Sequence, residues 1–573
     1  MKSQNVLKRI WHLWLLCVKG PGGKIALLYA AGVIVLNLFE IQIGLKMIQW
    51  NKDFYGALEQ YDADGALVQI GVFVILASIS SLLYVSTNYI RQLMQIRWRT
   101  TLTKAALDRW MHNKAYWKLN TSDTSALDNP DQRIAEDCRV FVEKITGGGQ
   151  DMGISGGVLD FFTGLVGLVT YVIVLWNLSD FAIEFTVFGK TVSIEHYMIW
   201  AAPLYVLLSS LMTHWLGAPL MKFNVIQKQR EADLRFSMTH FRESKEAIAL
   251  QAGEELEREV IDRRYDRIIE NWRRKMNREF ILGCFTRPYM YSMLRIPLFL
   301  SFPAYFLGHV AFGGLMQLSQ SFAKVVTSLS WFIFSYKHLA ELAASGNRLA
   351  TLLNLSEEAA NEKPAIAREY SEDGGLHIQD LHIQDPLGNE LLYLPELHVK
   401  AGEAVWVEGP SGMGKSTLFK SIAGLWQHCS GRVLLPQGKI LFLPQKPYLP
   451  LGNLAVAVAY PEMSNDPAKA RSLLMDVGLS KESHLEQVDS LAEMTTENIF
   501  SGGEQQRLII ARILSFQPDW VFLDEATSAL DSEAEKNLYT LLRESLPHTG
   551  FIVIAHRKPS GLGDFKHVVL EKA

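Results

Sequence analysis

The stretch that decides the fold of the C-terminal part of the chain is Gly409-Pro410-Ser411-Gly412-Met413-Gly414-Lys415-Ser416-Thr417. It fits G-x-x-x-x-G-K-[ST], a loop that wraps the phosphates of a nucleotide in backbone N–H groups. An apolar run over 404–407 precedes it and a helix-compatible run over 418–425 follows, which is the strand–loop–helix context that the motif needs. The glycines allow the required backbone angles, and the helix N-terminus adds a positive dipole end. The sequence therefore predicts an α/β nucleotide-binding domain.

Five further segments accompany this loop in a fixed order. They are Ile440-Leu441-Phe442-Leu443-Pro444-Gln445, Phe500-Ser501-Gly502-Gly503-Glu504-Gln505-Gln506-Arg507, Trp520-Val521-Phe522-Leu523-Asp524-Glu525, Ser528-Ala529-Leu530-Asp531 and Phe551-Ile552-Val553-Ile554-Ala555-His556. Together they resemble the Q-loop, signature, Walker B strand, D-loop and switch strand of the ATP-binding-cassette (ABC) ATPases. Two positions depart mildly from the usual signature, because Phe500 replaces Leu and Glu504 precedes the Gln.

The resemblance implies a Mg²⁺-dependent ATPase. Lys415 is expected to pair with the β- and γ-phosphates and Ser416 to ligate Mg²⁺. Asp524 would hold the same ion, directly or through water. Glu525 would polarise the attacking water as general base.

Other motif positions complete the expected ATP site. His556 would contact the γ-phosphate and the water, and Gln445 would sense both Mg²⁺ and the membrane domain. Ser501 and Gly503 would close over the γ-phosphate bound by another protomer. The full set expected to contact ATP is Gly409, Ser411, Gly412, Gly414, Lys415, Ser416, Thr417, Ser501, Gly503 and Asp531.

The adenine contact is left open by the sequence. Many cassettes stack the base on a Tyr some way before the phosphate loop, but the comparable run here, 383–386, holds no aromatic residue. Tyr393 lies later in the chain, and an Arg or an apolar contact is the alternative.

Composition divides the chain into two parts. Of 573 residues, 49% are hydrophobic, the mean hydropathy is +0.07, and the apolar surplus lies before residue 345. A net charge of −4 gives no indication of a nucleic-acid partner. The four cysteines are scattered without metal or disulfide spacing, so we expect reduced thiols. They are Cys17, Cys138, Cys284 and Cys429.

Six apolar stretches are long enough to cross a bilayer. They cover about 25–50, 66–93, 156–177, 197–221, 281–308 and 316–340. Residues 4–20 mix tryptophan and leucine with Lys8 and Arg9, which predicts an interfacial amphipathic helix, a disordered leader being the alternative. No cleavable signal peptide is expected. We predict a membrane domain over 1–345, a linker over 346–375 and the ATPase domain over 376–573.

Loop charges predict the orientation of the spans. Residues 94–155 and 222–280 are rich in Lys and Arg, whereas 51–65 and 178–196 are mostly acidic. The basic loops, both termini and the ATPase domain are therefore expected in the cytosol. Within 178–196, alternating residues predict a small external β-hairpin around Gly189 and Lys190.

The two long cytosolic loops each contain a candidate coupling helix. In the first, 128–137, a cap residue precedes Pro130 at the first helical position. The second candidate is 246–254. Each would carry force between the ATPase and the membrane helices, the alternative being that both are solvated helix ends.

These segments, with 329–333 and 341–344, resemble one subfamily of ABC transporters. It is the bacterial YddA-type half-transporters, whose membrane domain is of BacA/SbmA type and to which the peroxisomal fatty-acyl transporters are related. The resemblance implies an all-α, six-helix exporter-type (type IV) membrane domain in a bacterial inner membrane. It also implies ATP and Mg²⁺ as cofactors and a homodimer, with a heterodimer as the alternative. Substrates in this branch include peptides, corrinoids and fatty-acyl compounds.

Charges inside spans usually face a wet cavity. Arg287 and Arg295 lie eight residues apart in the fifth span, close to one helical face. Lys324 in the sixth span and Glu40 in the first are further candidates for a solute path. Ion pairing of the arginines with Glu40, or snorkelling to an interface, is the alternative. Two functions remain open: an ATP-driven transporter of an amphipathic solute, and a membrane-anchored ATPase that regulates a partner.

Overall fold

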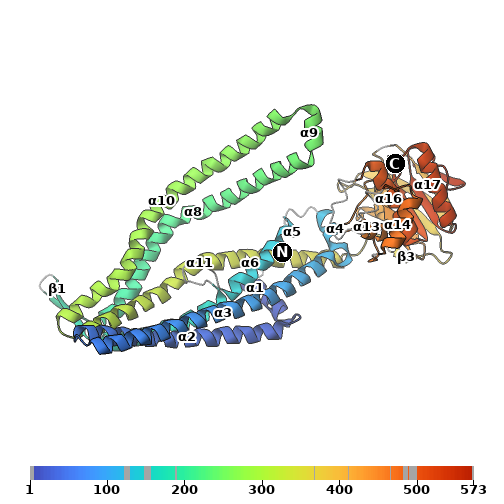
Figure 1. The fold of residues 1–573 in the computed structure, drawn as a ribbon. Helices are drawn as coiled ribbons and strands as arrows, with labels where there is room; N and C mark the ends of the chain where they lie inside the picture. The colour runs from blue at the N-terminus through green and yellow to red at the C-terminus, as the bar shows by residue number, and fades with distance from the viewer. Residues whose placement is uncertain are drawn as a thin grey trace. The chain divides into compact units, whose positions relative to one another are not determined.

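The computed structural model describes residues 6–121, 129–147, 157–187, 190–366, 368–410, 412–464, 466–481, 488 and 500–570. It divides into two compact units, Met1–Ala360 and Asn361–Ala573. The first is helical and the second is a mixed α/β unit (Figure 1). Ser411 lies outside the described residues.

The first unit contains long helices with shorter ones between them. Its elements are α1 (Val6–Lys19), α2 (Gly23–Glu59), α3 (Ala63–Met111), η1 (His112–Lys114), α4 (Ala115–Thr121), α5 (Pro130–Gln132), η2 (Arg133–Asp137), α6 (Cys138–Thr146), α7 (Val158–Leu178), β1 (Ala182–Val187), β2 (Lys190–Glu195), α8 (Tyr197–Glu243), α9 (Lys245–Gln251), α10 (Glu254–Phe306) and α11 (Phe312–Asn361). Helix α1 occupies most of the predicted interfacial segment. Residues 346–361, which the sequence places in a linker, continue α11.

Four helices of the described chain are long and apolar enough to cross a membrane. They are Gly23–Glu59, Ala63–Leu119, Val158–Leu178 and Tyr197–Glu243, and they contain the first four predicted spans almost completely. The fifth and sixth predicted spans lie largely on α10 and α11. Helices α8 and α10 lie side by side along their length and are joined by α9 (Figure 1).

The short elements between the spans follow the predicted pattern. Strands β1 and β2 pair antiparallel, with Val187 opposite Lys190, as expected for the hairpin. Helix α5 begins at Pro130, although Asn129 makes no side-chain cap bond there. Helix α9 covers most of the second coupling-helix candidate.

The second unit contains two sheets in its described part. Its strands are β3 (Arg368–Tyr370), β4 (Leu376–Gln384), β5 (Glu390–Val399), β6 (Ala404–Glu408), β7 (Cys429–Leu435), β8 (Ile440–Leu443), β9 (Trp520–Asp524), β10 (Gly550–Ile554) and β11 (Phe565–Val569). One sheet has the order β11-β6-β10-β9-β8 with all strands parallel, and the other has the order β3-β7-β4-β5.

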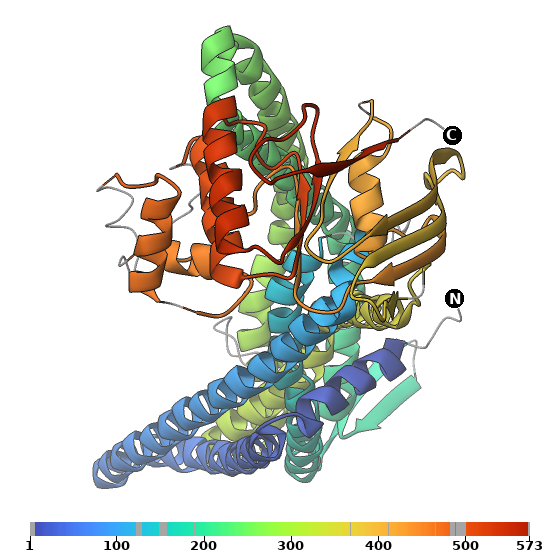
Figure 2. The ribbon, with the colours of Figure 1, turned by 90° about the vertical axis from the view of Figure 1, so that its right-hand side faces the viewer.

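Helices cover both faces of the parallel sheet. They are α12 (Lys415–Ile422), α13 (Leu454–Ala459), α14 (Pro467–Asp476), α16 (Gly502–Phe516) and α17 (Ser532–Ser545). Helix α12 packs between the two sheets (Figure 2). Its Phe419 contacts Phe522 of β9. Helices α13, α14, α16 and α17 lie on the opposite face of the parallel sheet. Their apolar side chains pack there against buried residues of β9 and β10. Strands covered on both faces are expected to be continuously apolar, as β9 and β10 are.

Candidate functional site: the ATP site

The motifs meet because four parallel strands end at one edge of the five-stranded sheet. Asp524, the last residue of β9, stands opposite Ile554, the last residue of β10. Leu443 of β8 stands opposite Leu523 of β9. In open α/β sheets, ligands bind beyond the carboxyl ends of the strands. The phosphate loop, the Q-loop, the Walker B end and the switch residue all follow such ends.

The phosphate loop forms as its glycines predict. Gly412 and Gly414 have φ values of 80° and 91°, a region that only glycine adopts without strain. Lys415, the first residue of α12, is 7% exposed, and its Nζ donates to the carbonyl of Gly409 at 2.6 Å. A buried ammonium held by backbone carbonyls is positioned to exchange them for phosphate oxygens.

Asp524 lies beside the same loop. It is 7% exposed, and it accepts a hydrogen bond from Ser416. Burial, followed by the neighbouring charge of Glu525, raises the pKa of this carboxyl above its ordinary value. A hydroxyl and a buried carboxylate side by side are oxygen ligands of the kind that Mg²⁺ prefers, and the pair fits such an ion.

Glu525 is the centre of a three-residue cluster. Gln445 Nε2 donates to Glu525 Oε2 at 2.7 Å, and His556 Nε2 lies 3.0 Å from Glu525 Oε1. The two partners therefore hold opposite oxygens of one carboxylate. Glu525 itself has a φ of 49°, and its N–H donates to Ile554 O at 3.0 Å. The three residues predicted to be catalytic are thus brought together from β8, β9 and β10.

The signature segment forms the start of α16. Ser501 caps this helix, and its N–H and Oγ both donate to Glu504 Oε2, at 3.0 and 2.9 Å. Glu504 N–H donates in return to Ser501 Oγ at 3.4 Å, and this reciprocal arrangement is a capping box. A hydrogen bond from Lys481, with the bond from Ser501 N–H, lowers the pKa of Glu504 to about 2. The departure from the usual signature therefore supplies a helix cap.

The D-loop is tied to the signature helix by a residue that the sequence did not single out. Gln506 Oε1 accepts from Ala529 N at 2.9 Å, while its Nε2 donates to Ser528 Oγ at 3.4 Å. Asp531 caps α17 by accepting from Glu533 N and Ala534 N. Gln506 is 4% exposed, and neither this burial nor its distant partners can be recognised from the sequence.

A second unpredicted residue, Arg512, joins α16 to the segment after the Q-loop. It is 3% exposed. Its guanidinium donates to Tyr448 O at 3.0 Å and twice to Ala457 O, at 3.1 and 3.0 Å. Burial lowers the pKa of Arg512 to about 10.

Tyr393, which the sequence left open as an adenine contact, stacks on His382, with ring centroids 4.4 Å apart.

The membrane unit brings together only part of the predicted solute path. Lys324 of α11 lies over the ring of Tyr171, 5.9 Å from its centroid. Its charge and that of Arg91 act on Glu40 of α2. On α10, Arg287 and Arg295 are exposed, and among the described residues neither pairs with Glu40. The pairing of these arginines with Glu40, considered above as an alternative, is therefore not seen there.

A buried ion pair in the described part of this unit joins two other residues. Arg91 of α3 donates to both oxygens of Asp160 in α7, at 2.8 and 3.2 Å, and the side chains are 4% and 8% exposed. Asp160 also accepts from Gly157 N at the start of α7. Both residues lie in predicted spans, so charge inside an apolar run was the signal that could have found them.

Comparison with known proteins agrees with this arrangement. A family described as "ABC transporter transmembrane region 2" matches residues 20–306, and one described as "ABC transporter" matches residues 395–528. The chain is a member of the ABC transporter family. It is 33% identical to the Escherichia coli inner membrane ABC transporter ATP-binding protein YddA over 91% of this chain and 90% of that protein.

This ABC transporter also resembles eukaryotic proteins of the D family. It is 27% identical to the human lysosomal cobalamin transporter ABCD4, over 92% of this chain and 88% of that protein. It is 26% identical to the chloroplastic ABC transporter D family member 2 of Arabidopsis thaliana, over 93% and 81%. The resemblance to YddA-type and D-family half-transporters is thereby confirmed, and the second unit is an ATPase.

Proposed function

We propose that this chain is one half of an ATP-driven transporter that moves an amphipathic or hydrophobic solute by alternating access. The observation that carries the proposal is the cluster in which Gln445 and His556 hold the two oxygens of Glu525. A general base needs a fixed carboxylate near the attacking water, and both neighbours can also orient that water. The same chain supplies a helical membrane unit.

The roles of the remaining ATP-site residues follow from their positions. Lys415 would bind the β- and γ-phosphates, while Ser416 and Asp524, with Gln445, would hold Mg²⁺. The bound ion would neutralise the charge that develops on the phosphates. Asp524 lies at the end of β9, so it faces the loop that would hold those phosphates.

Two copies of the chain would form the complete machine. Ser501 and Gly503 stand at the start of α16, where the N-terminus of a helix favours an anion. We propose that this end closes over ATP bound to a second copy and that hydrolysis at Glu525 reopens the pair. The full transporter would then have twelve spans, six from each exporter-type membrane domain.

The proposed location is the inner membrane of a bacterium, in keeping with the name of the E. coli relative. Both termini and the ATPase unit would lie in the cytosol, where ATP is found. The basic loops at 94–155 and 222–280 support this orientation.

The solute path is proposed to pass the cluster of Glu40, Lys324 and Tyr171. These side chains come from α2, α11 and α7, and they combine two charges with an aromatic ring. Charged groups within spans face the interior of a bundle or a wet cavity. The cluster suits a solute with both apolar and polar parts, such as a peptide, a corrinoid or a fatty-acyl compound. Arg287 and Arg295 are secondary candidates.

The test uses proteoliposomes with the ATPase units facing outward. External Mg-ATP is added, and a labelled peptide, corrinoid and acyl-CoA are followed, either added outside or preloaded. Accumulation that requires ATP and is lost in Glu525→Gln means export and names the solute class, whereas ATP-dependent loss of a preloaded compound means import. ATP hydrolysis without movement of any compound would contradict the transport proposal and favour a regulatory ATPase.

A further inference from the structure

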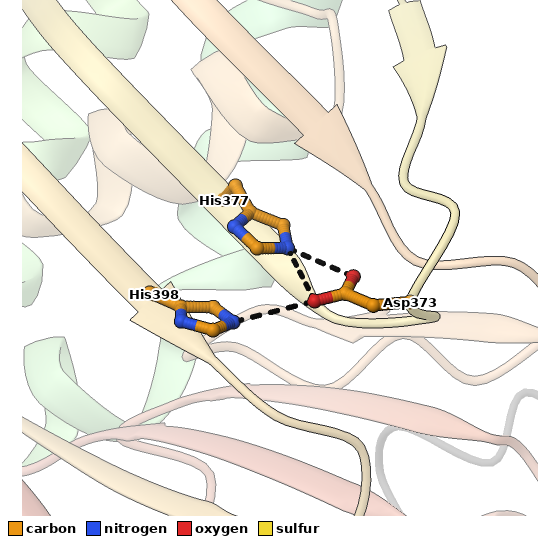
Figure 3. Close-up of side chains that lie close together, drawn as sticks. All are labelled: Asp373, His377 and His398. Carbon is orange, nitrogen blue, oxygen red and sulfur yellow. Dashed lines mark hydrogen bonds and ion pairs between the residues drawn. The ribbon is translucent and has the colours of Figure 1, made fainter.

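Outside the ATP site, the second unit carries a cluster of three side chains whose ligand atoms converge. Asp373, His377 and His398 come from the turn before β4, from β4 and from β5 (Figure 3). His377 Nε2 lies 2.8 and 2.9 Å from the two oxygens of Asp373, and His398 Nε2 lies 3.5 Å from Asp373 Oδ2. All three ligand atoms lie within 4.8 Å of one another.

The sheet explains why the two histidines meet. His377 and His398 are directly opposite in the antiparallel register of β4 and β5, so their side chains leave the same face. Their rings stack with centroids 4.1 Å apart and an interplanar angle of 17°. Both Nε2 atoms therefore face Asp373, as Figure 3 shows.

The turn holds the carboxylate in place from the other side. Gly374 has a φ of 71°, which bends the chain back so that Gly375 N donates to Asp373 Oδ1 at 3.0 Å. The His377 ring and the Gly375 N–H both contact the carboxylate of Asp373, and these contacts fix its orientation toward the two histidines.

One polar atom of the cluster makes no hydrogen bond. Nε2 of His398 is buried, and apart from its 3.5 Å ion-pair contact with Asp373 Oδ2 it has no hydrogen-bond partner among the described residues. A buried polar nitrogen without a hydrogen bond is unfavourable, and a metal ion at its lone pair would remove that cost. The three ligand atoms of this cluster are therefore distinct from those of the ATP site, because neither the phosphate loop nor Glu525 contributes any of them.

We propose that Asp373, His377 and His398 form a binding site for a divalent late transition-metal ion of the Zn²⁺ class. Imidazole nitrogens and carboxylate oxygens are ligands of such ions, and three protein ligands leave a fourth position to water. Ligand atoms around a tetrahedral Zn²⁺ lie roughly 3.4 Å apart, given bonds of about 2.1 Å. The 3.5 Å distance from His398 Nε2 to Asp373 Oδ2 already lies near this value.

The 2.8 and 2.9 Å distances from His377 Nε2 to Asp373 would lengthen on ion binding, through small side-chain rotations. The side chains of His377 and His398 are 25% and 39% exposed, so such rotations are open to them. The bound ion would join the 371–375 turn to β4 and β5, at the beginning of the ATPase unit. This proposal does not depend on the transported solute.

The experiment measures Zn²⁺ binding to the full-length protein in detergent, purified without a histidine tag and stripped with EDTA. Competition with a fluorescent chelator is followed without nucleotide, with excess Mg²⁺ to occupy oxygen-only sites. Absorption of bound Co²⁺ reports tetrahedral geometry. The variants are Asp373→Asn, His377→Gln and His398→Gln.

His382→Gln is the matched control. This histidine lies on the same strand pair, stacks on Tyr393 and pairs with Glu390 at 2.6 Å, but the described residues give it no third ligand. We expect saturable binding near one ion per chain, weakened about tenfold or more by each of the three variants and unchanged in the control. Zn²⁺ should also raise the melting temperature of the wild type but not of the three variants.

Two results would overturn the proposal. One is equal Zn²⁺ affinity in the wild type and in His377→Gln and His398→Gln, since the ion would then bind elsewhere. The other is equal loss in the His382 control. ATP turnover in Mg²⁺ verifies that each variant is folded.

Discussion

The ATPase unit and the membrane unit of this protein position their charged side chains in different ways. In the ATPase unit, Glu525, Gln445 and His556 follow the ends of parallel strands, and sheet register brings them together. In the membrane unit, charges sit along helices, and rotation about each helix axis decides their partners. The residues that meet at strand ends can thus be predicted from a sequence. The partners of a charge on a helix depend on the rotation of that helix, which only the packed structure shows.

The largest expected effect tests the ATPase side of this comparison. Glu525→Gln should lower the rate of ATP hydrolysis by about 10²–10⁴-fold, the range supplied by a general base, because the amide cannot accept the proton of water. ATP binding should persist, since Lys415 and Ser416 are intact. Phosphate release from the purified protein measures this change.

Glu533→Gln is the matched control for that measurement. Glu533 is an exposed acid near the D-loop whose backbone N–H, not its carboxylate, contacts Asp531. The Glu533→Gln variant should hydrolyse ATP at the wild-type rate. Wild-type turnover in Glu525→Gln would remove the general-base role.

The next effect concerns the membrane side. Asp160→Asn leaves the guanidinium of Arg91 buried without its carboxylate, which costs about 3–5 kcal/mol when one partner of a buried pair is removed. We expect a lower melting temperature and poor yield of folded protein in detergent. Arg287→Ala, at an exposed position of α10, should leave the melting temperature nearly unchanged. Equal losses of melting temperature in Asp160→Asn and Arg287→Ala would contradict the prediction, because the buried and the exposed charge would then contribute equally to stability.

A third prediction compares two arginines within the ATPase unit. Arg512→Ala leaves the carbonyls of Tyr448 and Ala457 without their donors, so the free energy of unfolding should fall by about 2–4 kcal/mol. Arg432→Ala breaks an exposed pair with Glu369 and should cost less than about 1 kcal/mol. Denaturant unfolding followed by tryptophan fluorescence measures both. A larger loss of unfolding free energy in Arg432→Ala than in Arg512→Ala would contradict the expectation that the buried arginine contributes more to stability.

The smallest effect depends on pH. The pKa of Asp524 is raised chiefly by burial, so the folded state keeps this proton to higher pH than the unfolded chain does. The free energy of unfolding therefore falls as the pH rises through both pKa values, and at pH 7 the carboxylate destabilises the Mg²⁺-free unit. Asp524→Asn should raise the stability at pH 7, by less than about 1 kcal/mol.

Asp385 provides a control with the opposite sign. Hydrogen bonds from the Asn389 side chain and backbone lower its pKa, so its contribution to stability is present above the unfolded pKa and is lost as the pH falls. Asp385→Asn should therefore lower the melting temperature at pH 7. Melting curves without Mg²⁺ at several pH values measure both variants, and shifts of the same sign would contradict this account.

Much of the ATPase fold could be predicted from sequence because each motif stands at the end of an apolar run. The run at 404–407 became β6, the loop after it formed around Lys415, and α12 followed. Gln506 and Arg512 were missed because their hydrogen-bond partners lie more than twenty residues away in the sequence. Such contacts leave no local pattern.

The membrane unit was predicted less completely. The first four spans and the β1–β2 hairpin could be predicted from apolar runs and from alternation. The Arg91–Asp160 pair joins residues 69 apart, and the sequence pointed instead to Arg287 and Arg295. Spacing along one helix shows which residues share a face, but it does not show what that face meets.

The backbone of Glu525 has a consequence for the evolution of this protein. Its φ of 49° is unfavourable for a residue with a Cβ, by about 1–2 kcal/mol, so glycine or asparagine would fit the position better. Selection for thermal resistance alone would favour such a replacement, whereas the proposed general-base role predicts that the replacement eliminates ATP turnover. A library of randomised variants sorted by heat tolerance should therefore enrich inactive sequences at this one codon, while sorting by growth that needs the transporter should retain glutamate.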